Sequence, residues 1–233
     1  MTAARVQSEL KSYSSKERAK NLARFFKTGK GEYGEGDRFI GIVVPNIRIV
    51  AKKYEDIPLS QVQILINNNI HEYRLAALLI LTYKYIKANS KTKKQIVNFY
   101  LKNLRFINNW DLVDLSSPKI LGMHYYNNPG REVLYKLARS KNLWEKRIAI
   151  LSTFEFIRNY SFDDSLNIAE ILLNDKHDLI HKAVGWMLRE IGKRNEKIEK
   201  EFLLKHYKTI PRTMLRYAIE KFDNKSKDFF LKK

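Results

Sequence analysis

The chain has 233 residues and carries 44 Lys and Arg against 25 Asp and Glu, a formal net charge of +19. It contains no cysteine, which excludes disulfides, thiolate metal sites and cysteine nucleophiles. A net charge of about 2 to 8 is enough to keep a small domain soluble, so an excess this large favours a polyanionic partner. Nucleic acid is the first candidate, and an anionic membrane surface is a poor second.

Hydrophobic residues make up 44% of the chain, which is ordinary for a folded protein and too high for disorder. The N-terminal segment, residues 1–21, lacks the apolar core of a signal peptide. The longest apolar run, residues 75–81, is broken by Thr82 and Lys84 and is too short to cross a bilayer. These features predict a cytoplasmic protein with no membrane partner.

Residues 28–37, TGKGEYGEGD, hold a cluster of glycines. Gly29, Gly31 and Gly34 match the G-x-G-x-x-G spacing of dinucleotide-binding loops. That fingerprint needs a strand before it and a βαβ unit around it, whereas ARFFK immediately upstream has a helical pattern. We therefore interpret residues 28–37 as a connector between two helices.

From residue 71 onward the sequence repeats itself weakly. Five segments align on their fourth residues: HEYRLAALLIL, NNWDLVDLSSP, WEKRIAILSTF, LIHKAVGWMLR and TMLRYAIEKFD. These anchors are spaced 37, 36, 35 and 34 residues apart, and the two positions after each are apolar in every copy. The anchors are Arg74, Asp111, Arg147, Lys182 and Arg216. Helix pairs that repeat at this length predict an all-α solenoid of HEAT-like repeats.

Helical geometry gives this register a direction. At about 100° per residue, the two apolar positions after each anchor must face the core. The same arithmetic puts four residues on an arc roughly opposite the core, on equivalent helices of consecutive repeats: Trp110, Asp114, Arg147 and Trp186. In a solenoid such an arc lines a continuous concave surface. The sequence thus predicts one domain, residues 1–233, forming a superhelix with a basic concave face.

Some of these residues have ordinary structural explanations. The position of Trp186 holds leucine in three other repeats, so Trp186 also fits a larger packing residue. The basic anchors suit a structural salt-bridge ladder as well as a track for DNA phosphates, and both interpretations stay open. This basic row comprises Arg74, Arg147, Lys182 and Arg216.

Asp114 breaks the pattern of the repeat. Its counterparts are all small or apolar, namely Ala77, Ile150, Gly185 and Ile219. A local departure of this kind is expected at functional sites, although a helix cap or a buried salt bridge also explains a carboxylate. Asp111 replaces the basic anchor in the same repeat, which is therefore acidic on a basic face.

No metal site or cofactor motif is indicated. His177 and His181 have helical i, i+4 spacing, but no nearby Glu or third ligand completes a zinc site. The other histidines, including His71, are scattered. A P-loop, an H-E-x-x-H motif and a Ser-His-Asp order are all missing from the sequence. We therefore expect neither a metal nor a nucleotide cofactor.

Four longer segments carry a family resemblance: KTGKGEYGEGDRFIGIVVPNIR, NNWDLVDLSSPKILG, NLWEKRIAILSTF and IHKAVGWMLREIGK. They resemble the AlkD family of bacterial DNA alkylation-repair glycosylases. The resemblance covers nearly the whole chain and is weakest before residue 20 and after residue 220. It implies a HEAT-like superhelix and a monofunctional enzyme that hydrolyses the N-glycosidic bond of alkylated purines in double-stranded DNA. We expect a monomer that associates with the nucleoid when bound to DNA.

The resemblance assigns roles to individual residues. Trp110 and Asp114 match the W-D-x-V-D motif, Arg147 matches W-x-x-R, and Trp186 matches G-W-x-L-R-E. These matches imply Asp114, Trp110 and Trp186 as catalytic residues and Arg147 as a DNA contact. The basic row adds Lys182, Arg74 and Arg216 as further DNA contacts. One family branch has glutamine after F-L-G-I where this chain has Val43, so contacts to the strand opposite the lesion are not carried over.

These residue types suit the implied chemistry. Alkylation at N3 or N7 makes a purine cationic, so it leaves as a neutral base without a general acid. The sugar becomes oxocarbenium-like, and a carboxylate beside its anomeric carbon stabilises that charge or orients the attacking water. Indole faces can hold the deoxyribose, and Arg147 can clamp a phosphate. This predicts excision of 3-methyladenine and 7-methylguanine during base excision repair. The family further implies that the lesion is not drawn into a deep base pocket.

The alternative function is a non-catalytic HEAT-like scaffold that binds DNA or an acidic protein, because a fold does not fix a function. The set formed by Trp110, Asp114 and Trp186 favours the enzyme, since a scaffold has no need of it.

Overall fold

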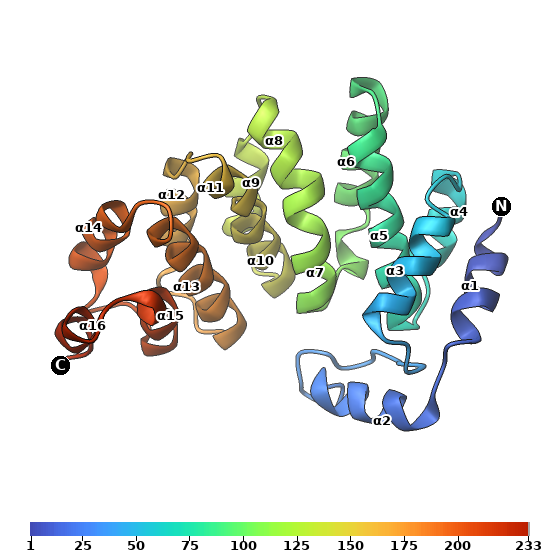
Figure 1. Ribbon diagram of the computed structural model, residues 1–233, viewed down its shortest axis with the longest axis horizontal. Helices are drawn as coiled ribbons and strands as arrows, with labels where there is room; N and C mark the ends of the chain where they lie inside the picture. The colour runs from blue at the N-terminus through green and yellow to red at the C-terminus, as the bar shows by residue number, and fades with distance from the viewer. Residues whose placement is uncertain (233) are drawn as a thin grey trace. The chain divides into compact units, whose positions relative to one another are not determined.

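The computed structural model describes residues 1–232, and every named element in that range is a helix (Figure 1). The α-helices are α1 Ala3–Lys11, α2 Lys16–Phe25, α3 Val44–Lys53, α4 Leu59–Ile66, α5 His71–Lys87, α6 Ser90–Lys102, α7 Trp110–Ser117, α8 Met123–Asn127, α9 Glu132–Ala138, α10 Leu143–Ser152, α11 Phe154–Arg158, α12 Asp163–Leu172, α13 Asp178–Gly192, α14 Glu196–His206, α15 Arg212–Ala218 and α16 Asn224–Leu231. Shorter elements are the 3₁₀ helices Leu104–Phe106 and Ile219–Lys221 and the π-helix Pro118–Gly122. The prediction of an all-α helical-repeat fold is confirmed.

The glycine-rich segment joins helices, as predicted. It lies between α2 and α3, in a stretch of turns whose one β-type pairing is an isolated bridge between Arg38 and Ile70. No βαβ unit surrounds the glycines within residues 1–232. None of the helices in that range is both long and apolar enough to span a bilayer.

The chain divides into two compact units, Met1–Ile120 and Leu121–Lys233. The expectation of a single domain over residues 1–233 stays a prediction. Each unit is organised around one long helix, α5 in the first and α13 in the second.

Helix α5 is the centre of the first unit. It packs against α3, α4, α6 and α7, and its residues 75–82 are all buried. Glu72 lies in its first turn, and Lys84 and Lys87 lie in its last turn, so these charges complement the helix dipole. Because α5 is covered on nearly all sides, its polar residues His71, Glu72 and Arg74 are buried as well. Buried groups of this kind need partners, and those partners shape the candidate site.

Helix α13 is the centre of the second unit, where it packs against α10, α11, α12, α14 and α15. Gly185 allows the close approach of α15. A Cβ atom at Gly185 would lie 2.4 Å from the carbonyl oxygen of Met214 and 2.6 Å from Cβ of Tyr217. The glycine is therefore required by packing, which explains why this repeat has no side chain at the position that Asp114 occupies in α7.

The repeat register agrees with the structure. The five aligned segments coincide with α5, α7, α10, α13 and α15. The paired apolar positions after each anchor are buried in every case except Tyr217, which is 36% exposed in the last repeat. Asparagine side chains cap the N-termini of four helices, α6, α7, α10 and α14, and so help to define where the repeats begin.

Gly185→Ala tests the close packing of α13 and α15. Alanine is favoured over glycine in a helix by about 1 kcal/mol, whereas overpacking costs about 1–3 kcal/mol. The atom in the way, the Met214 carbonyl oxygen, belongs to the backbone and cannot rotate aside. We therefore expect urea denaturation to show a less stable protein. A variant more stable than the parent would contradict the packing described here.

Candidate functional site

Helix α7 begins directly at the first candidate residue. Asn109 is the N-cap, and its side-chain oxygen accepts a hydrogen bond of 2.8 Å from the Trp110 backbone N–H. Asn109 is fully buried, and its amide nitrogen donates to Asp37 at 3.1 Å. The cap is thus held from the glycine-rich connector, 72 residues away in the sequence. The start of α7 cannot shift without breaking this contact.

An aromatic cluster supports the Trp110 side chain, which is itself partly exposed. The Phe26 ring stacks on the indole with a centroid distance of 5.1 Å and an interplanar angle of 21°. Phe25 meets the indole edge-on at 5.9 Å, and 63% of Phe25 is exposed. Phe26 also stacks on Phe39, with a distance of 5.0 Å between the ring centroids. Such contacts fix the orientation of an indole that still reaches solvent.

Asp114 lies one turn after Trp110 on α7 and is partly exposed. Beneath it the buried Tyr100 hydroxyl lies 2.8 Å from Ser116, whose hydroxyl donates to the Leu112 carbonyl. Burial raises the pKa of Tyr100, the bond with Ser116 opposes this, and the charge of Asp114 adds to the rise. The Asp114 charge is therefore felt by this neutral hydroxyl pair, at the edge of a tightly packed helix.

A buried ionic bridge fixes the other face of α7. His71, at the start of α5, lies between two carboxylates: Nδ1 is 2.9 Å from Asp37 Oδ2 and Nε2 is 2.8 Å from Asp111 Oδ2. All three side chains are at most 8% exposed. Phe39 stacks on the imidazole with a centroid distance of 4.4 Å. One histidine thereby joins the connector, α5 and α7.

Both nitrogens of the His71 ring face carboxylates, so the bridge is strongest when the imidazole is a cation. Burial alone lowers the pKa of His71, but the charge of Asp111 and hydrogen bonds to Asp111 and Asp37 outweigh it. The pKa rises from 6.5 to about 9. Burial raises the pKa of Asp37, but the contacts with His71 and Arg74 lower it by more. The pKa of Asp37 is therefore below its ordinary value. Two buried aspartates and a histidine cation therefore form one ionic group with one negative charge left over, and Arg74 is ion-paired with Asp37.

Arg74 completes this group. The basic row to which it belongs suits either a salt-bridge ladder or a track for DNA phosphates, and only 5% of Arg74 is exposed. Its guanidinium is ion-paired with Asp37 and donates to Asn108 at 2.6 Å. The connector folds back over α5 and covers this position, which the register of α5 alone could not indicate. For Arg74 these contacts favour the salt-bridge interpretation over the phosphate track.

Glu72 ties the end of the connector to α5. One of its carboxylate oxygens accepts backbone N–H bonds from Ile40, Gly41 and Ile42 at 3.0, 2.8 and 3.2 Å. Gly41 has φ +82°, and a Cβ there would lie 2.1 Å from the Ser15 carbonyl oxygen. A glycine is needed at this turn for both reasons. Val43, the position that departs from one branch of the family, caps α3 and is 41% exposed.

The second unit holds the other two motif residues. Arg147 on α10 is 5% exposed, and its Nη1 donates to the Leu179 carbonyl at 2.6 Å. The guanidinium therefore braces the first turn of α13. Trp186, farther along α13, is partly exposed, with its ring 5.8 Å from that of Phe154. Its Nε1 donates to Glu190 at 3.3 Å, so the indole is oriented by both neighbours.

The remaining basic anchors lie nearer the solvent. Lys182 is partly exposed and forms an i, i+4 ion pair of 2.7 Å with Asp178. Arg216 on α15 is exposed. The predicted basic row is thus uneven, because Arg74 and Arg147 are buried while these two reach the surface. That Trp110 and Asp114 share one arc with Arg147 and Trp186 stays a prediction.

His177 and His181, the two histidines with i, i+4 spacing, form hydrogen bonds to the backbone. His177 caps α13, with Nδ1 accepting from the Leu179 N–H at 3.1 Å, and His181 Nε2 lies 2.6 Å from the Asp175 carbonyl oxygen. Within residues 1–232 no three His, Asp or Glu side chains converge as metal ligands. Asp37 and Asp111 approach His71 from opposite ring nitrogens and therefore cannot share an ion with it.

Sequence reasoning missed Asp37 and His71. The sequence marks both residues only by their place, since His71 is the first residue of the first repeat segment and Asp37 is the last residue of the glycine-rich connector. His71 and Asp37 are 34 residues apart, and His71 and Asp111 are 40 residues apart. A local sequence pattern therefore predicts neither contact.

A comparison with protein families identifies the family of this chain. The sequence profile described as "DNA alkylation repair enzyme" matches residues 6–222, a range that includes Trp110, Asp114, Arg147 and Trp186. The chain belongs to this family of DNA alkylation repair enzymes. The resemblance to the AlkD family is thereby confirmed. Among curated protein sequences, none is significantly similar to this DNA alkylation repair protein.

Solved structures share the fold of this DNA alkylation repair protein. One is described as a predicted DNA alkylation repair enzyme from Enterococcus faecalis, with 15% identity, a TM-score of 0.70, and coverage of 91% of this chain and 97% of that chain. Another is AlkD2 from Streptococcus mutans, with 18% identity, a TM-score of 0.56, and coverage of 95% and 97%. At these identities the likeness concerns the fold alone.

The pH dependence of stability tests the His71 bridge in this repair protein. The folded-state pKa of about 9 lies above the ordinary 6.5, so the bridge stabilises fully below pH 6.5 and is lost as pH rises through 9. The free energy of unfolding should fall by about 3 kcal/mol over this range, since one pKa unit corresponds to about 1.4 kcal/mol. Urea denaturation of the parent and of His71→Gln at pH 6.5 and 9.5 measures the difference.

The control is His206→Gln, because burial lowers the pKa of His206 and places its titration at lower pH. This control should keep the parent's fall in stability, whereas His71→Gln should lose it. Identical pH dependence in the parent and His71→Gln would show that the imidazole carries no charge between the aspartates.

Proposed function

We propose that this protein is a DNA glycosylase that hydrolyses the N-glycosidic bond of cationic N3- and N7-alkylated purines in double-stranded DNA. Family membership supports a role in DNA alkylation repair, and the local chemistry of α7 supports the reaction. The observation that carries the proposal is the Trp110–Asp114 pair. It reaches solvent from a helix whose cap and opposite face are fixed by buried contacts.

In the proposed reaction the bond between the sugar C1′ and the purine nitrogen breaks, and its electron pair neutralises the cationic base. The charge left behind spreads over C1′ and the ring oxygen. Asp114 stabilises this oxocarbenium-like sugar and orients the water whose oxygen bonds to C1′ and whose proton is released. The Trp110 face supports the deoxyribose and attracts its positive charge. No general acid is required, because alkylation has already made the base a good leaving group.

Rigidity is part of this proposal. A preorganised carboxylate is effective because it does not have to reorient when charge develops. Asn109, Asp111 and the aromatic stack on Trp110 each hold the first turn of α7, so the pair needs little rearrangement. His71 and Asp37 are positioning residues in this scheme, since they act through Asp111 and Asn109.

The second unit contributes the other residues of the proposal. Trp186 is proposed as a further support for the sugar, and Lys182 and Arg216 as contacts to the DNA backbone. Arg147, which is as buried as Arg74, is proposed to act indirectly by holding the first turn of α13. The net charge of +19 favours approach to a polyanion in general. Arg74 is left out of the proposed DNA contacts because its guanidinium is buried against Asp37.

Asp114→Asn separates an enzyme from a scaffold. The amide keeps the shape of the side chain but removes the negative charge. Loss of one preorganised electrostatic group lowers a rate by roughly 10²–10³. We expect a fall of that size in single-turnover excision of 7-methylguanine from duplex DNA, with unchanged or slightly tighter binding to undamaged duplex. Excision of uracil, a neutral base, should be negligible in the parent as well.

The matched control is Asp56→Asn, which removes the same charge from an exposed loop of the same unit. Thermal unfolding of both variants separates chemistry from stability. If Asp114 serves only as a structural partner, Asp114→Asn should unfold more easily and its activity should follow the folded fraction. A well-folded Asn variant with parental excision would refute the catalytic role and favour the non-catalytic scaffold.

The salt dependence of DNA binding tests the proposed backbone contacts. Each neutralised phosphate contributes a slope of about −0.9 in a plot of log K against log salt concentration. Arg216→Gln should therefore weaken duplex binding and make the slope shallower by about one such unit. Lys197→Gln on α14, a similarly exposed cation outside the basic row, is the control and should change the slope less. Equal slopes for Arg216→Gln and the parent would remove Arg216 from the proposal.

A further inference from the structure

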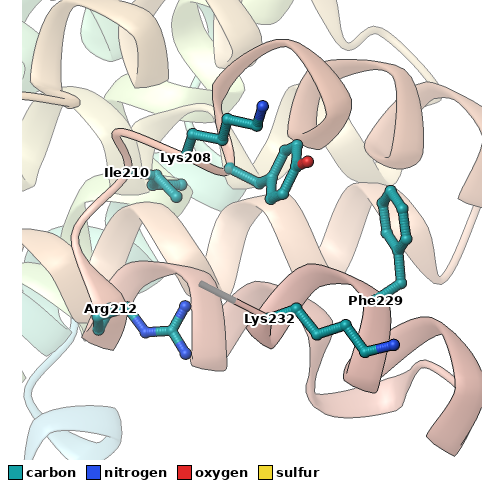
Figure 2. Close-up of a pocket in the computed structure, with 6 residues that line it drawn as sticks. Lys208, Ile210, Arg212, Phe229 and Lys232 are labelled. Atoms are coloured by element: carbon teal, nitrogen blue, oxygen red, sulfur yellow. The ribbon is translucent and has the colours of Figure 1, made fainter.

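The C-terminal helices enclose a cavity of about 650 Å³ that the proposed function does not use (Figure 2). Its walls are Tyr207, Lys208, Ile210, Arg212, Phe229 and Lys232. Three of these six residues are cationic, two are aromatic and none is acidic. The volume is within the range of about 300–1,000 Å³ that is typical of small-molecule sites. The cavity lies wholly within the second unit.

The cavity forms where three elements meet. Tyr207 caps the C-terminus of α14, the turn that follows carries Lys208 and Ile210, and α15 begins at Arg212. Phe229 and Lys232 come from α16 and its C-cap. Arg212 Nη2 donates to the Leu231 carbonyl at 3.0 Å and so ties α15 to the end of α16. Figure 2 shows the labelled side chains arranged around the opening between these elements.

The aromatic wall has an exposed face. Phe229 is 49% exposed, whereas its neighbour Phe230 is 3% exposed and supports it edge-on at 5.1 Å. Tyr207 lies 5.7 Å from Phe229 at an angle of 31°. The two rings already touch, so together they form one aromatic wall of the cavity against which a planar ligand would stack. An exposed, buttressed ring of this kind is a stacking platform.

The cations complement this platform. Lys208 and Lys232 are both exposed, and with Arg212 they border the same cavity. Lysine and arginine bind phosphate oxygens through charge-assisted hydrogen bonds. A planar ring and an anionic group in one small ligand describe a nucleotide. By contrast, a cationic alkylated purine released from DNA would be repelled by three positive charges.

We propose that this cavity binds a nucleotide unit, with its base on Phe229 and its phosphate between Lys208 and Lys232. The matched family range ends at residue 222, before both Phe229 and Lys232, so family membership assigns no role to these two residues. The unit has two possible sources, a free mononucleotide and an unpaired strand of DNA. The inference concerns undamaged nucleotides and is independent of excision.

The test is isothermal titration of the full chain with 5′-dAMP, with a short single-stranded oligo(dA), and with inorganic phosphate. Phe229→Leu should weaken nucleotide binding on the order of tenfold, the scale of losing one stacked base. The double variant Lys208→Gln/Lys232→Gln should weaken binding and flatten its salt dependence. Lys197→Gln, which removes a charge from α14 outside the cavity, is the control and should bind as the parent does.

The outcomes are distinct. Binding of 5′-dAMP that is sensitive to Phe229→Leu identifies a mononucleotide site, and sensitivity seen only with oligo(dA) identifies a strand site. Phosphate that competes as well as 5′-dAMP, together with parental binding by Phe229→Leu, would reduce the cavity to a charged surface and overturn the proposal. So would the absence of binding by every nucleotide probe. Thermal unfolding confirms that each variant is folded, and none of these results depends on the fate of Asp114→Asn.

Discussion

The first unit depends on one buried cation. The His71 imidazolium lies between Asp37 and Asp111, and Arg74 balances the second negative charge. Leaving any member of such a group without its partner would strand a charge in the core, which is strongly destabilising. Because the three bridged side chains come from the connector, α5 and α7, the bridge sets the relation of these segments. The aromatic stack from Phe39 through Phe26 to Trp110 follows from the same docking.

The His71 bridge explains how this strongly basic protein can hold the Asp114 carboxylate in a fixed position near the solvent. The interior charges of α7 are neutralised locally by His71, so Asp111 does not add to the negative potential of the surface. Asp114 lies one turn farther along, on the part of the helix that reaches solvent. Its carboxylate is thus surrounded by a positive protein and held on a fixed helix. That combination suits a group whose proposed partner is a sugar with developing positive charge.

The two units use buried polar contacts differently. In the first unit, ion pairs and Glu72 hold an irregular connector against a helix. In the second, Arg147 and Gly185 adjust helix-to-helix packing, one by a bond to the Leu179 carbonyl and the other by the absence of a side chain. The C-terminal cavity is different again, since its cations are exposed and face solvent. Of these features, that cavity is the most readily altered without disturbing a core.

The sequence by itself determined the all-α class and the helix-pair register, and it singled out Trp110 and Asp114 as the candidates that stay a proposal, because helical periodicity and local motifs depend on residues a few positions apart. It also marked the connector correctly through its glycines. Only the tertiary structure decided that Arg74 is buried and that His71 is a bridging cation. Those outcomes depend on pairings 34 to 40 residues apart, which follow from how the connector folds over α5. A register shows which side of a helix a residue occupies, but not which distant segment covers that side.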